Sequence, residues 1–221
     1  PFLFVVGRSL LSSRAGGVAA LLASVSSFLL FYAQEAKMYS LFAFLSLLSG
    51  YFLWRAVRRN TWWEWIVYAA ITTLAFYTHV YGIMLVPASC LFVLTQWRAA
   101  HVSLVRSGIA LAILTLPYVP LAVWQWSLFT SSWFKVRSYY GDISMLGIVR
   151  QLLWKFSTRQ TGLPEWFVIG FFGTLSLAGM SPLMKRRLFS FDRRRPLFLA
   201  SFIVVPLLLS YVFAWRLAVF D

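Results

Sequence analysis

Long apolar runs constrain the fold of this chain more than any other feature of its sequence. Several of them approach 20 residues, which is long enough for a helix to cross a bilayer core of about 30 Å. In lipid, a spanning helix satisfies all of its own backbone hydrogen bonds. We therefore predict an all-α polytopic transmembrane helical bundle of about seven spans, with the end of one more at residues 1–7. The predicted spans are residues 15–33, 40–54, 62–77, 83–97, 107–126, 166–182 and 197–215.

The composition agrees with a membrane protein. Hydrophobic residues make up 61% of the chain and charged residues 12%, whereas soluble domains carry about 25% charged residues. The net charge is +14, which in a soluble chain would favour nucleic-acid binding. Here most basic residues lie in short loops between apolar runs, so we expect membrane lipids, and no nucleic acid, as partners. The single cysteine, Cys90, lies inside an apolar run and is expected to be a small buried hydrophobe.

The basic residues also predict which loops share one side of the membrane. If the first loop is inside, strict alternation places the strongest basic segments inside as well, as the positive-inside rule requires. The tip at residues 34–37, the tip around His79 and the polar segment 127–164 then lie outside. Glu64, near the inner edge, is assigned a structural role. The inner basic segments are residues 8–14, 55–59, 98–106 and 185–195.

The segment 127–164 is expected to be an outer loop that contains an amphipathic helix on the membrane surface. Within it Leu146, Val149, Leu153 and Phe156 recur at spacings of three and four, so they share one face of a helix. This loop also carries five basic residues, against the general orientation, and that exception is a candidate for function. They are Lys135, Arg137, Arg150, Lys155 and Arg159.

We expect the 221 residues to be one incomplete transmembrane domain of a longer protein. The chain starts at Pro1 inside an apolar stretch and ends at Asp221 just after another. Neither end resembles a natural terminus.

The first candidate site is the tip between the apolar runs 15–33 and 40–54. Gln34, Glu35 and Lys37 lie there, and Tyr39 follows at the start of the next run. Ionisable side chains at the edge of a bilayer mark functional sites by default. A Lys can neutralise a phosphate, and a Glu can accept a sugar hydroxyl, bind a metal or hold the Lys in place. The alternative is a local Glu–Lys pair that caps a helix hairpin.

The second candidate is His79, which the alternation of spans places on the same side as Glu35. His and Glu are suitable zinc ligands, so these two residues could contribute to a divalent metal site. The alternative is a hydrogen-bonded structural histidine. Arg137 and the other cations of the outer loop could bind the phosphate of a lipid carrier, because Arg contacts such groups through two N–H donors. The alternative role for these cations is attraction to the anionic headgroups of membrane lipids.

The segment from Tyr32 to Tyr39 reads Tyr-Ala-Gln-Glu-Ala-Lys-Met-Tyr. It is followed by a Leu-rich helix, an Arg-rich inner loop, a Trp-rich span start and then Phe-Tyr-Thr-His at 76–79. This order resembles the multi-spanning glycosyltransferases that use lipid-phosphate sugars, of the fold called GT-C. They include dolichyl-phosphate-mannose protein mannosyltransferase-like and aminoarabinose-transferase-like proteins, whose pattern is Tyr-x-Gln-Glu-Ala-Arg-x-Tyr. The resemblance covers most of residues 1–126.

The resemblance implies roles for individual residues. Lys37 stands where the family has Arg, near the donor phosphate. It therefore keeps the positive charge and lacks the paired N–H donors of a guanidinium. Gln34 and Glu35 would lie at the sugar or metal end of the site, and His79 matches the family's Tyr-Thr-His tip. The family's catalytic Asp lies in the first outer loop. It is therefore expected upstream of Pro1, which leaves no catalytic residue in these 221 residues and an inactive fragment.

The expected function is transfer of a hexosyl or pentosyl group from a polyprenyl-phosphate donor to an acceptor lipid, glycan or protein. We expect the reaction at the outer face of a bacterial inner membrane, and the resemblance implies inversion at the anomeric carbon. One alternative is a transporter or flippase of lipid-linked sugars, which would favour ionisable groups near mid-membrane and paired broken helices. Another is a structural membrane subunit without activity.

Overall fold

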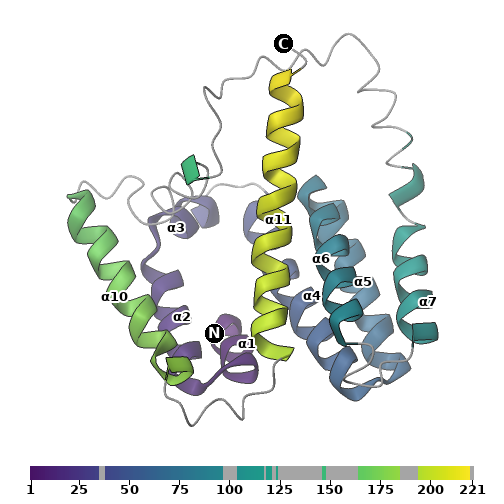
Figure 1. The fold of residues 1–221 in the computed structure, drawn as a ribbon, viewed down its shortest axis with the longest axis horizontal. Helices are drawn as coiled ribbons and strands as arrows, with labels where there is room; N and C mark the ends of the chain where they lie inside the picture. Colours follow the sequence, from purple (N-terminus) through teal and green to yellow (C-terminus); the bar gives the residue numbers. More distant parts are fainter. Residues whose placement is uncertain are drawn as a thin grey trace. The chain divides into compact units, whose positions relative to one another are not determined.

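The computed structural model describes residues 1–34, 38–96, 104–116, 118–120, 123, 146–147, 164–184 and 194–219. All regular structure within these residues is helical, without a strand, which agrees with the predicted all-α class. The chain forms two compact units (Figure 1). Unit 1 holds residues 1–43 and 144–196, and unit 2 holds residues 44–143 and 197–221.

Unit 1 contains α1 (Phe2–Leu10), α2 (Ser13–Val25), α3 (Ser27–Gln34) and α10 (Glu165–Met184). Its tightest contact joins α1 and α2 at two glycines. A Cβ added to Gly7 would lie 2.7 Å from the Cα of Gly16, and one added to Gly16 would lie 2.6 Å from the carbonyl oxygen of Phe4. Glycine is therefore required at both positions, because the atoms in the way belong to the backbone. Helix α10 packs along α2 (Figure 1).

The predicted span 15–33 is two helices and not one. Helix α2 ends at Val25, and Ser26 has an extended backbone with φ −69° and ψ 114°. The Ser26 side chain then accepts a hydrogen bond from the backbone N–H of Leu29, at 3.4 Å. Ser26 thus acts as the N-terminal cap of α3, which is the position that serine favours.

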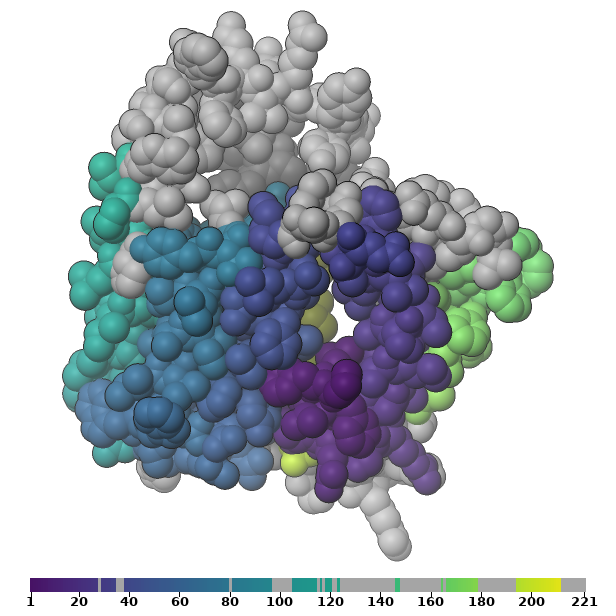
Figure 2. Space-filling model, turned by 180° about the vertical axis from the view of Figure 1, so that it is seen from behind, coloured from purple at the N-terminus to yellow at the C-terminus, as the bar shows by residue number. Residues whose placement is uncertain are grey.

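Unit 2 contains most of α4 (Tyr39–Arg59), α5 (Trp62–Thr78), the short 3-10 helix η1 (Val80–Met84), α6 (Leu85–Gln96), α7 (Leu104–Thr115) and most of α11 (Arg194–Val219). Its core is aromatic. Trp54 of α4 stacks on Phe92 of α6 with ring centroids 6.1 Å apart, and Phe198 of α11 meets both rings edge-on at 5.7 and 5.0 Å. Helix α7, coloured teal, forms one edge of this unit (Figures 1 and 2).

A buried hydrogen bond joins α4 and α5 in this core. The hydroxyl oxygens of Ser49 and Thr72 are 2.6 Å apart, and both residues are fully buried. Thr72 donates its hydroxyl hydrogen to the Tyr68 carbonyl oxygen at 2.8 Å, so Ser49 is the donor to Thr72. Both hydroxyls are therefore paired, which removes the cost of burying them.

Two helices are long and apolar enough to cross a membrane by length and composition. One is α4, whose most apolar window has a mean hydropathy of 1.4. The other is the part of α11 from Arg194 to Tyr211, with a mean hydropathy of 1.3. Other apolar helices in the described ranges are shorter, so the count of seven spans stays a prediction. The shorter ones are Ser13–Val25, Tyr81–Gln96, Val105–Leu114 and Trp166–Ala178.

Two predicted loops differ from the structure or lie outside it. Helix α4 continues to Arg59, so the basic segment 55–59 is helical and not a loop. Its extension is explained by the ion pairs described below. The amphipathic helix predicted between residues 146 and 156 lies almost wholly outside the described residues, apart from two helical residues at 146–147.

Candidate functional site

The predicted tip after residue 33 has a helix on each side. Helix α3 ends at Gln34, and α4 begins at Tyr39. Gln34 is exposed and Tyr39 is half-buried. Glu35 and Lys37 lie outside the described residues, and so does Arg137. The helix on each side of the charged pair is thus described, while the geometry of the pair stays a prediction.

Aromatic rings connect the two sides of this tip. The rings of Tyr32 and Tyr39 meet edge-on, with centroids 4.7 Å apart and planes at 72°. Phe31 meets Tyr32 in the same way at 5.3 Å and 89°. Such pairs add about 0.5–1.5 kcal/mol beyond the area they bury. The two tyrosines that bracket the Gln-Glu-Ala-Lys sequence therefore hold the ends of α3 and α4 together.

His79 shapes the second tip through hydrogen bonds of its own. Its backbone N–H closes α5 by donating to the Ala75 carbonyl oxygen at 3.0 Å. Its Nδ1 then accepts the backbone N–H of Tyr81 at 3.1 Å, which starts η1. The structure therefore gives His79 a hydrogen-bonded structural role. Since Nδ1 is an acceptor, a substrate or metal would have to use Nε2.

The charge state of His79 follows from the same surroundings. Burial lowers the pKa of His79 below its ordinary value of 6.5, so the imidazole is neutral at pH 7. A neutral ring is the form that can accept a hydrogen bond at Nδ1.

The tip around His79 also needs a close backbone approach at Gly82. A Cβ on Gly82 would lie 2.5 Å from the Cα and 2.7 Å from the backbone nitrogen of Phe76, in the last part of α5. The backbone N–H of Gly82 donates to the His79 carbonyl oxygen at 2.8 Å. The sequence Thr-His-Val-Tyr-Gly at residues 78–82 thus forms a tight reversal whose shape depends on glycine.

The described residues of the predicted site are divided between the two units. Gln34 and Tyr39 belong to unit 1 and His79 to unit 2, and the units are described separately. Within the described ranges, no three His, Cys, Asp or Glu side chains gather as a metal site would need. A metal held by Glu35 and His79 therefore stays a prediction.

The strongest polar cluster of the described residues lies at the opposite end of α4 and α5. Glu64 has a side chain that is only 3% exposed, and its Oε1 accepts from Arg55 Nη2 at 2.7 Å and from Arg59 Nη1 at 3.1 Å. Arg55 also donates from Nη1 to the hydroxyl of Tyr51 at 3.4 Å. The structural role predicted for Glu64 is confirmed. The two arginines, assigned by sequence to orientation alone, are also its partners.

The turn between α4 and α5 is closed by a residue distant in sequence. Asn60 has a φ of 50°, in the left-handed region, where Asn is more often found than most residues. Its carbonyl oxygen accepts a hydrogen bond from Arg106 of α7, and its side-chain oxygen accepts from Trp65 Nε1 at 3.4 Å. The Arg106 guanidinium also lies 5.8 Å from the ring centroid of Trp62. This turn therefore joins three helices.

Comparison with known proteins gives a family match. A family model described as dolichyl-phosphate-mannose-protein mannosyltransferase matches residues 2–126, which is more than half of the chain. The matched range contains both tips and the polar cluster at the other end of α4 and α5. No curated protein and no solved structure matches the chain.

Proposed function

We propose that this chain, which belongs to the dolichyl-phosphate-mannose-protein mannosyltransferase family, is part of an enzyme that transfers a sugar from a polyprenyl-phosphate donor to an acceptor. The family match over residues 2–126 carries this proposal, since that range includes the segment from Gln34 to Tyr39. Membership indicates a glycosyltransferase with a lipid-linked donor. The class of sugar, the class of acceptor and the location at the outer face of a bacterial inner membrane are what we propose in addition.

Lys37 is proposed to contact the donor phosphate. During transfer the bond between the anomeric carbon and the phosphate oxygen breaks, and the lipid phosphate leaves with added negative charge. A cation placed at that oxygen stabilises the transition state more than the ground state. Arg137 of the outer loop is proposed to add a second cation. Gln34 and Glu35 are proposed to contact sugar hydroxyls.

The acceptor hydroxyl must lose a proton as it attacks. A carboxylate within hydrogen-bond reach is a suitable general base. In this proposal that base is the Asp that the family resemblance expects before Pro1, so no residue from 1 to 221 is assigned the step. Tyr39 and His79 are proposed to position the donor from the ends of their helices.

Charge placement favours a transferase over a flippase of lipid-linked sugars. A flippase would favour ionisable groups near the middle of the membrane. In the part of the chain that the structure describes, α5, α7 and α10 carry their charged residues in the first turn, and α4 carries its own in the last turns. The middle of each of these helices is uncharged.

The test replaces Lys37 in the full-length protein. We expect Lys37→Ala to lower sugar transfer from a polyprenyl-phosphate donor by about 100-fold, the usual effect of removing one group that stabilises a developing oxyanion. Lys37→Arg should keep most of the activity, because it keeps the charge. The matched control is Arg14→Ala, which removes one exposed positive charge from α2.

Unchanged transfer by Lys37→Ala would contradict the phosphate contact. The flippase would instead be supported if the wild-type protein translocated lipid-linked sugars without transferring them, and if Lys37→Ala lost that translocation. Transfer assayed with and without a chelator of divalent cations tests the metal. Loss with the chelator and rescue by added Zn²⁺ or Mg²⁺ would support a site that includes Glu35 and His79.

A further inference from the structure

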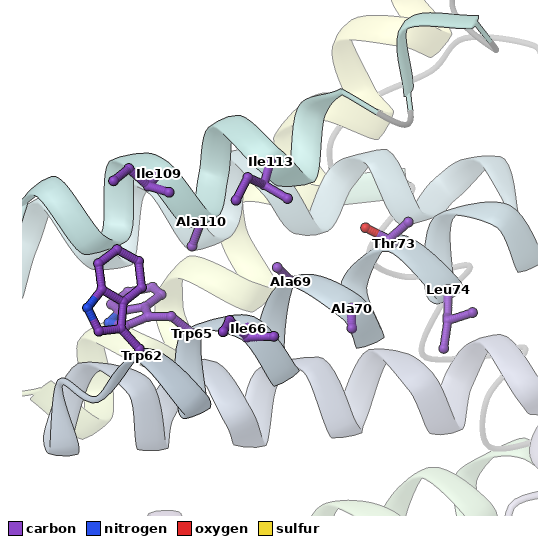
Figure 3. Close-up of a pocket in the computed structure, with 10 residues that line it drawn as sticks. All are labelled: Trp62, Trp65, Ile66, Ala69, Ala70, Thr73, Leu74, Ile109, Ala110 and Ile113. Carbon is purple, nitrogen blue, oxygen red and sulfur yellow. The ribbon is translucent and has the colours of Figure 1, made fainter.

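An apolar groove runs between α5 and α7 in unit 2 (Figure 3). It encloses about 450 Å³, a size typical of ligand sites. Its floor is made of buried residues, among them Trp65, Ala69 and Ala110. Its walls include Ile66 and Ile113, each 55% exposed. The alanines of the floor and the branched side chains of the walls thus leave a channel open at the surface.

The two helices are parallel and are joined at both ends of the groove. At one end Arg106, near the start of α7, lies over Trp62, the first residue of α5. At the other end the hydroxyl of Tyr118 donates to the Thr72 carbonyl oxygen at 3.4 Å, and the Tyr118 ring contacts Phe76. The groove is therefore a fixed feature of this helix pair, because its walls are held together above and below.

The length of the groove fits one leaflet of a bilayer. Its lining on α5 extends from Trp62 to Leu74, which at 1.5 Å per residue is about 18 Å along the helix. Half of a bilayer core is about 15 Å. A single lipid acyl chain that starts at the Trp62 end would thus reach about as far as the groove does.

The polar end of the groove is positively charged. Arg106 lies beside Trp62 there, and the turn that Arg106 closes also joins Arg55 and Arg59 to Glu64. With Arg58, this end of α4, α5 and α7 carries four arginines and one glutamate, a formal charge of +3. Trp is the residue that favours the headgroup level of a membrane. At the other end the lining residues, Thr73 and Leu74, are uncharged.

We infer that this groove binds one anionic diacyl phospholipid, with an acyl chain along α5 and α7 and the headgroup phosphate beside Arg106. The pairing of a chain-length apolar channel with positive charge at one end only is complementary to such a lipid. This inference is independent of sugar transfer and of the tips at Gln34 and His79, which lie elsewhere in the chain.

The test measures lipid binding to the purified full-length protein by native mass spectrometry. Delipidated protein is titrated with phosphatidylglycerol, which is anionic, and with phosphatidylcholine, which is zwitterionic. We expect one phosphatidylglycerol to bind at least tenfold more tightly than phosphatidylcholine. Ala70→Phe fills the groove and should weaken this binding about tenfold. The control is Ala112→Phe, since Ala112 is equally an exposed alanine, on α7, and does not line the groove.

A second pair of variants tests the charge. Arg106→Gln should bring the affinity for phosphatidylglycerol down to that for phosphatidylcholine, whereas Arg106→Lys should keep the preference. Thermal unfolding of both variants shows whether the turn at Asn60 still forms, and Ala70→Phe tests the site without touching Arg106. Sugar transfer by Ala70→Phe should equal that of the wild type, which separates this site from the proposed donor site.

Three results would overturn the inference. One is equal binding of the two phospholipids by the wild-type protein. Another is an equal effect of Ala70→Phe and Ala112→Phe. The third is that polyprenyl phosphate, added as a competitor, displaces phosphatidylglycerol from the groove at equal concentration, which would make the groove part of a donor site.

Discussion

Arg55 reaches Glu64 through two of its nitrogens, with Nε 3.0 Å and Nη2 2.7 Å from the same carboxylate oxygen. The contact connects the last turns of α4 to the first turn of α5. Arg59 adds a third bond to that oxygen. A carboxylate that is almost completely buried thus depends on two arginines, of which one is 30% and the other 61% exposed.

Replacing Glu64 by Gln is expected to destabilise the protein. Removing one partner of a buried ion pair costs about 3–5 kcal/mol. Here both arginines can reach water, so we expect a smaller loss, about 2 kcal/mol. Thermal unfolding in detergent measures it, and the double variant with Arg55→Met shows whether the two losses are coupled. Losses that simply add would contradict the pairing.

Replacing Gly16 by Ala is expected to separate α1 from α2. The new Cβ would lie 2.6 Å from the Phe4 carbonyl oxygen and 2.8 Å from the Arg8 backbone nitrogen, and neither can move without moving the helix. Overpacking of this kind costs about 1–3 kcal/mol. The measurement is the shift of the unfolding midpoint.

Gly17 provides a matched control for that variant. It is the next residue in α2, and a Cβ there would have no atom within 4 Å. Gly17→Ala should therefore stabilise the protein by up to about 1 kcal/mol, because alanine has the higher helix propensity. Equal effects of the two substitutions would argue against the close approach of α1 and α2.

The free energy of unfolding should decrease as the pH is lowered, because His79 becomes protonated. The pKa of His79 in the folded protein is lowered by burial below 6.5, so the unfolded chain binds a proton first. The stabilisation from neutral His79 is complete above about pH 6.5 and is lost as pH falls toward the lowered pKa of the folded state. Protonation at Nδ1 also ends acceptance of the Tyr81 N–H. Unfolding midpoints between about pH 5 and pH 7.5 test this.

The control uses the second histidine of the chain. His79→Asn should reduce the pH dependence, because an Asn side chain can accept the same N–H and does not titrate. His101→Asn should leave it in place. A pH profile that changes only with His101→Asn would contradict the assignment to His79.

Tyr39 allows its structural and proposed binding roles to be separated. Tyr39→Phe keeps the ring that meets Tyr32 at 4.7 Å, so stability should remain within about 0.5 kcal/mol. Tyr39→Ala removes the ring contact and should cost about 1–2 kcal/mol. If the hydroxyl contacts the donor, Tyr39→Phe should lower sugar transfer without lowering the unfolding midpoint. Equal transfer by Tyr39→Phe and the wild type would limit Tyr39 to a structural role.

The apolar pattern predicted helices better than it predicted where they end. Hydrophobic runs account for α4 and α6, since apolar side chains there pack on one another in the core. The break at Ser26 was missed because neither Gly nor Pro marks it. Its local signal is a serine in a cap position. The continuation of α4 to Arg59 was missed because Arg59 can pair with Glu64 only once the turn at Asn60 has brought the two residues together.

For the candidate site, the sequence predicted the positions of residues along the chain and not the contacts of their side chains. Sequence placed Gln34 and His79 at helix ends, and the structure agrees. It did not predict the ring contact of Tyr32 with Tyr39 or the acceptor role of His79 Nδ1, because both depend on side-chain directions. Glu35, Lys37 and Arg137 lie outside the described residues, so their roles remain predictions.

The bond from Arg106 to Asn60 has a consequence for the order of assembly during synthesis. The two residues are 46 positions apart. At about 5–20 residues per second, Arg106 is made roughly 2–9 s after Asn60. Until then the left-handed turn between α4 and α5 lacks the contact that closes it. The hairpin of α4 and α5 therefore reaches its final form only after α7 has begun to emerge from the ribosome.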